Sequence, residues 1–380
     1  MTSGSDRRAT VCFVAPSLAG GGAERVAVQL LNALDPDRWS RSLYLFQRTG
    51  PYLADVSPSI RVESADATSR VAQWRHLRRF LRTLRPDVVV VFLSYFSVLT
   101  AARSAGIATR VVFDMGTPVS AFLADTDYRW SGPWMRRLFT RVMRRACAAA
   151  DLLRATSTGV ADDLVGTFGA PRSRVCIVPN PVDVGAIATA SRESIDGPFA
   201  QRWSSPVIVA AGRLAEAKNY PLLIDALAIL RETTPASLFI LGAGDQEPAV
   251  RAAIRARGLD EVVHLCGFQR NPWKFIARAD VFALTSRYEG FGNVIVEAMA
   301  CGVPVVATSS PGTRDIVTDG IDGLLVDRHE PAAVAAALAR ALGDATLRRR
   351  LAEAARRKAD IYRTETIVAA YERALAGALA

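Results

Sequence analysis

Short apolar runs alternate with longer amphipathic stretches along nearly the whole chain, and this alternation constrains the fold more than any other feature. The run Val11–Ala15 is followed by Gly20-Gly21-Gly22 and by a stretch with helical periodicity from about Ala23 to Leu34. Runs of this length are typical of buried strands, and strands that alternate with helices assemble into parallel sheets. Further strands of the first half are predicted at Leu43–Phe46, Val88–Phe92, Val111–Phe113, Leu152–Ala155 and Val175–Val178.

The pattern is interrupted once, near the middle of the chain. Asn180-Pro181-Val182-Asp183 has the composition of a turn, and little periodicity follows it as far as Ser205. Six more strands are then predicted at Val207–Ala211, Leu238–Leu241, Val262–Leu265, Val281–Leu284, Val303–Ala307 and Leu324–Val326. Because 380 residues suit two domains, we expect two α/β halves of similar size and a helical tail from Thr346 to Ala380.

Composition excludes several classes of protein. Half of the residues are hydrophobic and 22% are charged, as in a folded globular chain. The five cysteines are scattered, without a CxxC pair or a Cys/His cluster of zinc spacing, so a reducing, cytoplasmic compartment is expected. The longest apolar stretch, Val88–Ala102, is shorter than the roughly 20 residues that a membrane span needs.

The net charge of +10 lies almost entirely in the first half. Residues 1–185 contain 24 lysines and arginines against 15 aspartates and glutamates, a balance of +9. Two predicted basic amphipathic helices, from Arg75 to Arg85 and from Trp130 to Leu153, contribute much of it. Two interpretations stay open: docking to an anionic membrane surface, or ordinary helices that expose arginine to water. Nucleic acid is not expected as a partner, because neither a binding motif nor an aromatic stacking platform is evident.

Two short segments carry weaker chemical signals. The turn Gly20–Gly22 joins a strand to a helix, where backbone N–H groups and the helix N-terminus can approach an anion. Arg213 and Lys218 follow the strand that ends at Ala211, in the region where α/β proteins bind ligands. Arginine offers a fork of donors to phosphate oxygens and lysine a point charge. Each segment is also compatible with a plain turn or with solvated cations.

The strongest signal is the sequence EGFGNVIVE from Glu289 to Glu297, which follows the strand Val281–Leu284. Its glycines permit tight turning and expose backbone N–H groups. Glu289 falls on a loop, and Glu297 lies one to two turns into the next helix. Both carboxylates can therefore face one ligand, with the positive end of the helix between them, and can bind sugar hydroxyls by charge-assisted hydrogen bonds. A glutamate in a first helical turn can also merely complement the helix dipole.

With these motifs the chain resembles the retaining glycosyltransferases of family 4, which have the GT-B fold. The resemblance runs through nearly the whole chain and is most specific at Ser286–Thr308, SRYEGFGNVIVEAMACGVPVVAT, the E-x7-E signature of that family. It also includes GGAERV at Gly21–Val26, NPVD at Asn180–Asp183, GRL with Lys218, LGAGD at Leu241–Asp245, HLCGF at His264–Phe268 and DGIDGLL at Asp319–Leu325.

The resemblance implies an α/β architecture of two Rossmann-like domains facing across a cleft. Residues 1–185 would form the acceptor-binding domain and residues 186–360 the nucleotide-sugar-binding domain, while residues 361–380 would form a helix that packs back on the first. The implied activity is a metal-independent, retaining hexosyl transfer from a nucleotide-diphosphate sugar to an acceptor hydroxyl. The expected acceptor is a saccharide or a lipid-linked saccharide, in the synthesis of cell-surface glycan or lipopolysaccharide.

The resemblance also assigns roles to individual residues of this chain. Arg213, Lys218 and Glu289 are the implied catalytic residues, and Glu297 is expected to hold the ribose hydroxyls. The donor site is completed by Gly21 and Gly22, by Gly267 and Phe268 beside the base, and by the backbone of Gly290, Phe291, Gly292 and Asn293. The nucleotide sugar is a co-substrate, and neither a cofactor nor a metal ion is implied.

One position departs from the family pattern. Many members carry a histidine after the fifth strand of the first domain, whereas Asp114 stands near that place here. Asp114 is therefore a candidate contact for the sugar or the acceptor. His76 and His264 are interpreted as structural or solvated. Asp125-Thr126-Asp127 has spacing that can hold a divalent cation, but it is interpreted as a solvated loop.

Two other functions are weighed against this one. A sugar-nucleotide epimerase on the same fold would need further acid/base groups, and the chain has only three histidines. A non-catalytic membrane-surface or polyanion-binding protein would not be expected to keep Arg213, Lys218, Glu289 and Glu297 together. The basic first half leads to the hypothesis of a peripheral enzyme at the inner face of the plasma membrane, with a lipid-linked acceptor.

Overall fold

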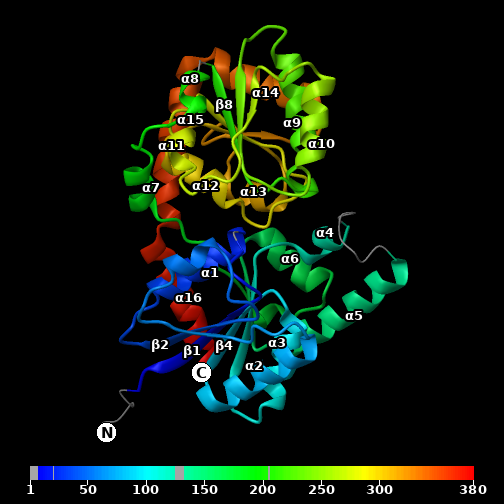
Figure 1. Cartoon of the computed structure of the whole chain (residues 1–380), viewed down its shortest axis with the longest axis vertical. Helices are drawn as coiled ribbons and strands as arrows, with labels where there is room; N and C mark the ends of the chain where they lie inside the picture. The colour runs from blue at the N-terminus through cyan, green and yellow to red at the C-terminus, as the bar shows by residue number, and fades with distance from the viewer. Residues whose placement is uncertain (1–6, 20, 125–131, 204–205) are drawn as a thin grey trace. The chain divides into compact units, whose positions relative to one another are not determined.

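The computed structural model describes residues 7–19, 21–124, 132–203 and 206–380. The chain forms two compact units, residues 1–181 with 364–380 and residues 182–363 (Figure 1). Within the described residues, the first unit has a seven-stranded sheet in the order β3-β2-β1-β4-β5-β6-β7, and the second a six-stranded sheet in the order β10-β9-β8-β11-β12-β13. All pairings within the two sheets are parallel. Parallel sheets must be covered on both faces, and helices cover them here.

The first unit contains the strands β1 (Ala9–Ala15), β2 (Trp39–Leu45), β3 (Arg61–Ser64), β4 (Val88–Phe92), β5 (Arg110–Met115), β6 (Leu152–Ala155) and β7 (Val175–Ile177). Its α-helices are α1 (Gly22–Ala33), α2 (Arg70–Leu84), α3 (Tyr95–Ser104), α4 (Val119–Ala124), α5 (Pro133–Ala149), α6 (Thr158–Gly166) and α16 (Thr364–Leu379). The sequence pattern missed β3. This edge strand is short, and its backbone pairing with β2, rather than an apolar run, makes it a strand.

The second unit contains β8 (Val207–Ala211), β9 (Ser237–Leu241), β10 (Val263–Leu265), β11 (Val281–Leu284), β12 (Val305–Thr308) and β13 (Leu324–Val326). Its helices are α7 (Val184–Ala190), α8 (Pro198–Gln201), the 3-10 turn η3 (Glu216–Lys218), α9 (Tyr220–Leu230), α10 (Glu247–Ala256), α11 (Trp273–Ile276), α12 (Asn293–Ala300), α13 (Pro311–Ile316), α14 (Pro331–Gly343) and α15 (Ala345–Ala359). One apolar core joins α9, α10 and α14 to the sheet, and another joins α7, α11, α12 and α15 to it.

The predicted helical tail consists of two helices, α15 and α16. After α15 the chain makes a 3-10 turn at Asp360–Tyr362, and α16 then begins at Thr364. The backbone N–H of Val182 donates to the carbonyl of Tyr362 at 2.8 Å, so the two segments that join the units are hydrogen-bonded to each other. α16 belongs to the first unit, where it packs against α1 and β5. The boundaries between the two units therefore fall at 181/182 and 363/364. The boundaries expected from the sequence, 185/186 and 360/361, lie within a few residues of these positions.

A buried ion pair fastens α16 to the strand ends of the first unit. Arg154 on β6 is 1% exposed and Asp114 on β5 is 4% exposed, and their Nη1 and Oδ1 atoms lie 2.7 Å apart. Tyr371 on α16 donates to the other carboxylate oxygen of Asp114 at 3.1 Å. Arg154 also donates to the carbonyls of Val178 and Pro179 and to the side chain of Asn180. Burial raises the pKa of the Tyr371 phenol well above its usual value, so it stays protonated as a donor.

Arg154→Met is expected to lower the free energy of unfolding by about 3–5 kcal/mol, because it leaves the Asp114 carboxylate buried without its counter-charge. Urea unfolding followed by circular dichroism measures the loss. Arg103→Met is the matched control, since Arg103 pairs with Asp151 at 2.8 Å but is half exposed, and such pairs contribute about 0–1 kcal/mol. Equal effects of the two substitutions would contradict the role given to Arg154.

Candidate functional site

The carboxyl ends of β8 and β11 meet at the centre of the second sheet. From β8 the chain proceeds to β9 and β10 on one side and then crosses to β11 on the other. This is the topological switch point of the sheet, and ligands of open α/β sheets bind outside the strand ends at such a point. Arg213 and Lys218 follow β8, and Glu289 follows β11. Because β8 and β11 are neighbouring strands, the loops that follow them lie close together, although they are about 70 residues apart in the chain.

Lys218 and Glu289 form an ion pair across this switch point. The Lys218 Nζ lies 2.6 Å from the Glu289 Oε1, and the Ser286 hydroxyl donates to the same oxygen at 2.6 Å. The Glu289 side chain is 10% exposed and the Lys218 side chain 22% exposed. An ammonium has three N–H donors, and Glu289 accepts from one of them. The pair therefore holds both side chains in fixed positions at the ends of β8 and β11. The other N–H donors of Lys218 can still bind an anionic ligand.

Arg213 differs from Lys218 in its surroundings. It lies one residue beyond Gly212 at the end of β8 and is exposed. Among the described residues, its guanidinium makes neither an ion pair nor a hydrogen bond. The cation is thus available at the switch point, next to a lysine that is already oriented.

Glu297 lies in the second turn of α12 and is 2% exposed. Its Oε2 accepts a hydrogen bond from the indole Nε1 of Trp273 on α11 at 2.8 Å. A buried carboxylate needs such partners, because desolvation of an unpaired charge is costly. The structure thus gives Glu297 a more specific environment than an exposed glutamate that only complements a helix dipole. Trp273 was missed from the sequence, where no motif connects it to Glu297.

The loop between Glu289 and α12 is built from close backbone contacts. Gly292 has a φ of +92°, a conformation that favours glycine, and it precedes the first residue of the helix. The Phe291 side chain is buried and packs edge-on against Tyr362, so only its backbone can take part in a site. A Cβ at Gly312 on α13 would lie 2.5 Å from the carbonyl oxygen of Glu289. Gly312, which the sequence motifs did not single out, therefore sets how close α13 comes to this loop.

Gly267 and Phe268 follow β10 and are joined to the same edge of the sheet. The N–H of Gly242 donates to the carbonyl of Gly267 at 2.8 Å. Gly242 has a φ of +151°, and a Cβ there would lie 1.9 Å from the carbonyl oxygen of Gly212. The loops after β8, β9 and β10 are thus locked together by backbone contacts that require glycine. The Phe268 side chain is 52% exposed, so it is accessible to a ligand at this edge of the sheet.

Three of the predicted residues belong to the first unit. Gly21 is the N-cap of α1 and Gly22 its first residue, whereas Gly20 lies outside the described residues. Both carboxylate oxygens of Asp114 are bound within the unit, by Arg154 and Tyr371. Burial raises the pKa of the Asp114 carboxyl, and the Arg154 guanidinium opposes this rise. A contact of Asp114 with sugar or acceptor would require one of these partners to be displaced, and that contact stays a prediction.

The other titratable groups that the sequence raised have structural surroundings. His76 Nδ1 lies 3.0 Å from the Tyr44 hydroxyl. His264 is buried, and burial lowers its pKa. Asp125-Thr126-Asp127 lies outside the described residues. In the part of the chain that the structure describes, no group of three or more histidine, cysteine, aspartate or glutamate side chains could hold a metal ion.

Comparison with known proteins identifies the family. Residues 191–358 match the family described as "Glycosyl transferases group 1", and residues 20–185 match "Glycosyltransferase Family 4". The chain belongs to the family 4 glycosyltransferases. The predicted α/β GT-B fold and the predicted nucleotide-sugar glycosyltransferase are thereby confirmed, and these matches do not favour the epimerase or the non-catalytic alternative.

Curated relatives cover most of this glycosyltransferase. The Campylobacter jejuni N-acetylgalactosamine-N,N'-diacetylbacillosaminyl-diphospho-undecaprenol 4-alpha-N-acetylgalactosaminyltransferase is 29% identical over 82% of this chain and 84% of its own length. The lipopolysaccharide core biosynthesis glycosyltransferase LpsE of Rhizobium meliloti is 26% identical over 88% of this chain and 89% of its own length. A solved structure of Anabaena Alr3699/HepE in complex with UDP and glucose has a TM-score of 0.80 at 21% identity, covering 97% of this chain and all of that one, and so shares its fold.

Gly312→Ala is expected to lower the free energy of unfolding by about 1–3 kcal/mol, because the added methyl group overpacks α13 against the Glu289–Gly290 backbone. Gly343→Ala is the matched control, since a Cβ at the end of α14 meets no atom within 4 Å, and it should be neutral or stabilising by up to about 1 kcal/mol. Urea unfolding of the two variants checks the difference. A Gly312→Ala variant as stable as the wild type would contradict the close approach.

Proposed function

We propose that this glycosyltransferase transfers a hexosyl unit from a nucleotide diphosphate to an acceptor hydroxyl with retention of configuration and without a metal ion. The observation that carries the proposal is the convergence of Arg213 with the Lys218–Glu289 ion pair at the strand ends of β8 and β11. The two cations can bind the diphosphate as it departs from the sugar, and the oriented carboxylate can bind the hydroxyls of that sugar. Preorganised donors of this kind stabilise the charge that develops on a leaving group.

The proposed reaction breaks the bond between the anomeric carbon and the diphosphate oxygen on the same face on which the acceptor oxygen forms the new bond. The electron pair goes to the diphosphate, where Arg213, Lys218 and the N–H groups of residues 290–293 stabilise it. The departing phosphate oxygen takes the proton of the acceptor hydroxyl. Glu289 then contacts hydroxyls of the transferred sugar; its hydrogen bonds with Lys218 and Ser286 favour an orienting role over that of a nucleophile.

The nucleoside would be bound by the other end of the same loop cluster. The buried Glu297 is the proposed partner of the ribose hydroxyls, oriented by its hydrogen bond from Trp273. Gly267 and Phe268 are the proposed neighbours of the base, and Gly21 and Gly22 at the start of α1 the proposed donors from the first unit. UDP is the first choice of nucleotide, because the Anabaena structure that shares this fold contains UDP and glucose.

The names of the relatives support an acceptor of the cell surface. One is named for transfer to a saccharide on diphospho-undecaprenol, and another for synthesis of the lipopolysaccharide core. We place the present chain in the same kind of synthesis, with a saccharide or lipid-linked saccharide as acceptor.

UDP is expected to raise the thermal stability of the protein more than GDP or ADP do, with EDTA present because the proposed site uses no metal ion. A ligand at 100 times its Kd that binds only the folded state adds about 2.7 kcal/mol. Arg213→Ala should weaken binding through the lost diphosphate contact. Glu297→Gln should weaken it by about 10-fold or more, since hydrogen bonds to charged groups contribute about 1.5–3 kcal/mol.

Arg251→Ala serves as the control for this titration, because Arg251 is exposed on α10 and pairs with Glu247 one turn away. It should bind UDP like the wild type. If none of the three nucleotides stabilises the wild type, or if Arg213→Ala and Glu297→Gln bind as well as Arg251→Ala, the proposed donor site is wrong.

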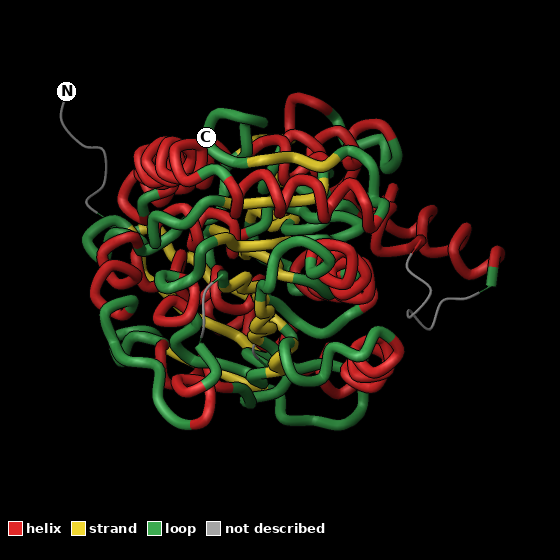
Figure 2. Tube along the Cα trace, turned by 90° about the horizontal axis from the view of Figure 1, so that it is seen from above, coloured by secondary structure: helices red, strands yellow, loops and turns green. Residues whose placement is uncertain are grey.

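The outer face of α5 supports a peripheral location at an anionic membrane, such as the cytoplasmic face of the plasma membrane. This helix extends away from the sheet of its unit (Figures 1 and 2). Trp134, which is 65% exposed, shares the outer face with Leu138, Arg137 and Arg141, one or two turns apart. Basic amphipathic helices with exposed aromatic residues bind anionic lipid surfaces. Among the described residues, no helix is both long and apolar enough to cross a bilayer.

Sedimentation with phosphatidylglycerol-containing vesicles at low salt tests this location. The wild type should sediment with the vesicles, and the double variant Arg137→Gln/Arg141→Gln should lose most of that binding, because each basic residue near an anionic surface contributes about 1 kcal/mol. The variant Arg349→Gln/Arg357→Gln removes two exposed charges from α15 instead and should bind like the wild type. Equal binding of the two double variants would assign the effect to net charge alone.

A further inference from the structure

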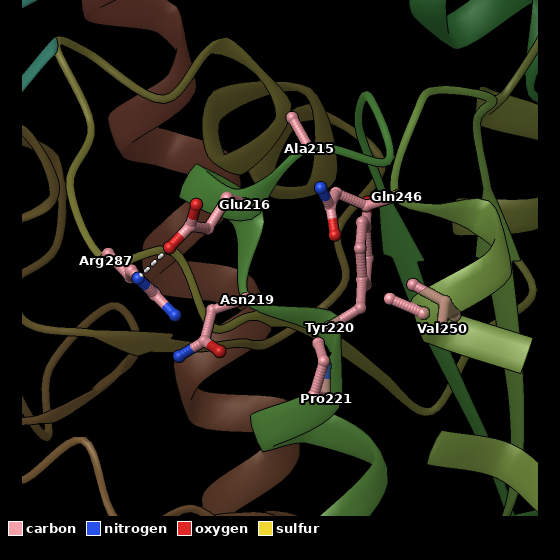
Figure 3. Close-up of a pocket in the computed structure, with 9 residues that line it drawn as sticks. Ala215, Glu216, Asn219, Tyr220, Pro221, Gln246, Val250 and Arg287 are labelled. Carbon is pink, nitrogen blue, oxygen red and sulfur yellow. Dashed lines mark hydrogen bonds and ion pairs between the residues drawn. The ribbon is translucent and has the colours of Figure 1, made fainter. Parts of the chain in front are cut away.

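A pocket of about 220 Å³ lies in the second unit beside η3, and none of the residues assigned to the donor site lines it (Figure 3). It is bounded by the loop after β8, the starts of α9 and α10, and the segment after β11. Its lining consists of Ala215, Glu216, Asn219, Tyr220, Pro221, Gln246, Ala249, Val250 and Arg287. The volume is below the roughly 300–1,000 Å³ of pockets that take drug-sized ligands, so the space suits a single ring.

The polar part of the lining is neutral but rich in both donors and acceptors. Glu216 and Arg287 face each other and form an ion pair at 2.5 Å (Figure 3). Their charges compensate, so the pocket offers no unpaired charge of its own to an ionic ligand. Asn219 and Gln246 add two carboxamides, each of which can donate and accept. Figure 3 shows the Gln246 carboxamide directed toward the turn that carries Glu216.

The opposite part of the lining is apolar. Pro221 and Val250 lie on either side of the Tyr220 side chain (Figure 3), and Ala249 also belongs to this part of the wall. A sugar ring matches such a combination, because it presents hydroxyls that donate and accept around its edge and C–H groups on its faces. Ligand sites in general combine an apolar wall with a few placed polar groups.

Asn219 provides a second reason to regard the pocket as a built site. Its φ of +49° lies in the left-handed region, which is uncommon for a residue with a side chain and tolerated best by asparagine and aspartate. Backbone of this kind is frequent at ligand sites. Asn219 lies between the two elements, as the C-cap of η3 and the N-cap of α9. Among the described residues, its carboxamide makes no hydrogen bond.

The pocket is connected to the donor site through one turn of backbone. Glu216 and Lys218 are the first and last residues of η3. Glu216 lines the pocket, and Lys218 forms the ion pair with Glu289. The N–H of Arg287 donates to the carbonyl of Ala217 in the same turn at 2.8 Å. A ligand that binds Glu216 and Arg287 therefore acts on the two segments that also carry Lys218 and Glu289.

We propose that this pocket is a second saccharide-binding site, which takes one neutral sugar unit and is coupled through η3 to the Lys218–Glu289 pair. The unit comes either from a saccharide chain, as in an acceptor or product, or from a free sugar that regulates the enzyme. In both cases the pocket would recognise the same features, the hydroxyls and the C–H faces of one neutral sugar ring. Because coupling between sites is reciprocal, the sugar and the nucleotide change each other's Kd by the same factor.

Saturation-transfer NMR on the full chain with methyl glycosides of glucose, galactose, mannose and N-acetylglucosamine tests the site. The experiment is run with Ala249→Leu, which places a larger side chain in the pocket from an exposed position of α10, and with Ala256→Leu, an exposed control two turns along the same helix. At least one glycoside should give a signal that Ala249→Leu reduces at least fivefold and that Ala256→Leu and Arg213→Ala leave unchanged.

Two further measurements separate the sources and the coupling. A disaccharide with a lower Kd than its methyl glycoside indicates a chain unit, and equal Kd values indicate a free sugar. Saturation with the glycoside should shift the Kd of UDP at least twofold in the wild type and not in Ala249→Leu. The proposal is overturned if no glycoside of the panel binds, if Ala249→Leu leaves the signal intact, or if the Kd of UDP does not move. If UDP does not bind at all, the proposed donor site and the coupling are refuted, and a glycoside signal that Ala249→Leu abolishes would support the saccharide site alone.

Discussion

The ion pair between Lys218 and Glu289 depends on a constraint that orders the whole second unit: strands of a parallel sheet end at the same edge. Since β8 and β11 are neighbours in the sheet, the loops that follow them must meet, although about 70 residues separate them in the chain. The hydrogen bond from Ser286 holds the same carboxylate oxygen. The site is thus preorganised by the sheet rather than by the loops, which makes it available to a ligand without large rearrangement.

Close backbone approach is the second device that shapes this edge. Gly212, Gly242, Gly267 and Gly292 all have φ values that favour glycine, and Gly242 and Gly312 touch neighbouring carbonyl groups that a Cβ would strike. Each contact sets one loop against another. The loops can therefore remain short and still present their N–H groups and side chains at fixed positions. One of them contains η3, which carries Lys218 of the proposed donor site and Glu216 of the sugar-sized pocket.

Local patterning was sufficient for most of the strands, because a strand buried on both faces must be continuously apolar. Val88–Phe92, Leu152–Ala155, Val207–Ala211 and Val281–Leu284 occur where the apolar runs lie. The same reasoning failed at β3, whose sequence RVES has no such run because it is an edge strand. Periodicity alone does not locate the turn at Asp360–Tyr362 that divides the helical tail, since this turn is decided by where the chain returns to the first unit.

By itself, the sequence determined the α/β class, the two repeated halves and the residues Arg213, Lys218, Glu289 and Glu297 as candidates, because periodicity and motif spacing are local properties. Only the tertiary structure decided their partners. It paired Lys218 with Glu289, placed Trp273 against Glu297, and enclosed Asp114 between Arg154 and Tyr371. Such contacts join segments up to 257 residues apart, and no local pattern encodes them, since they depend on strand order and on the packing of helices that the chain completes last.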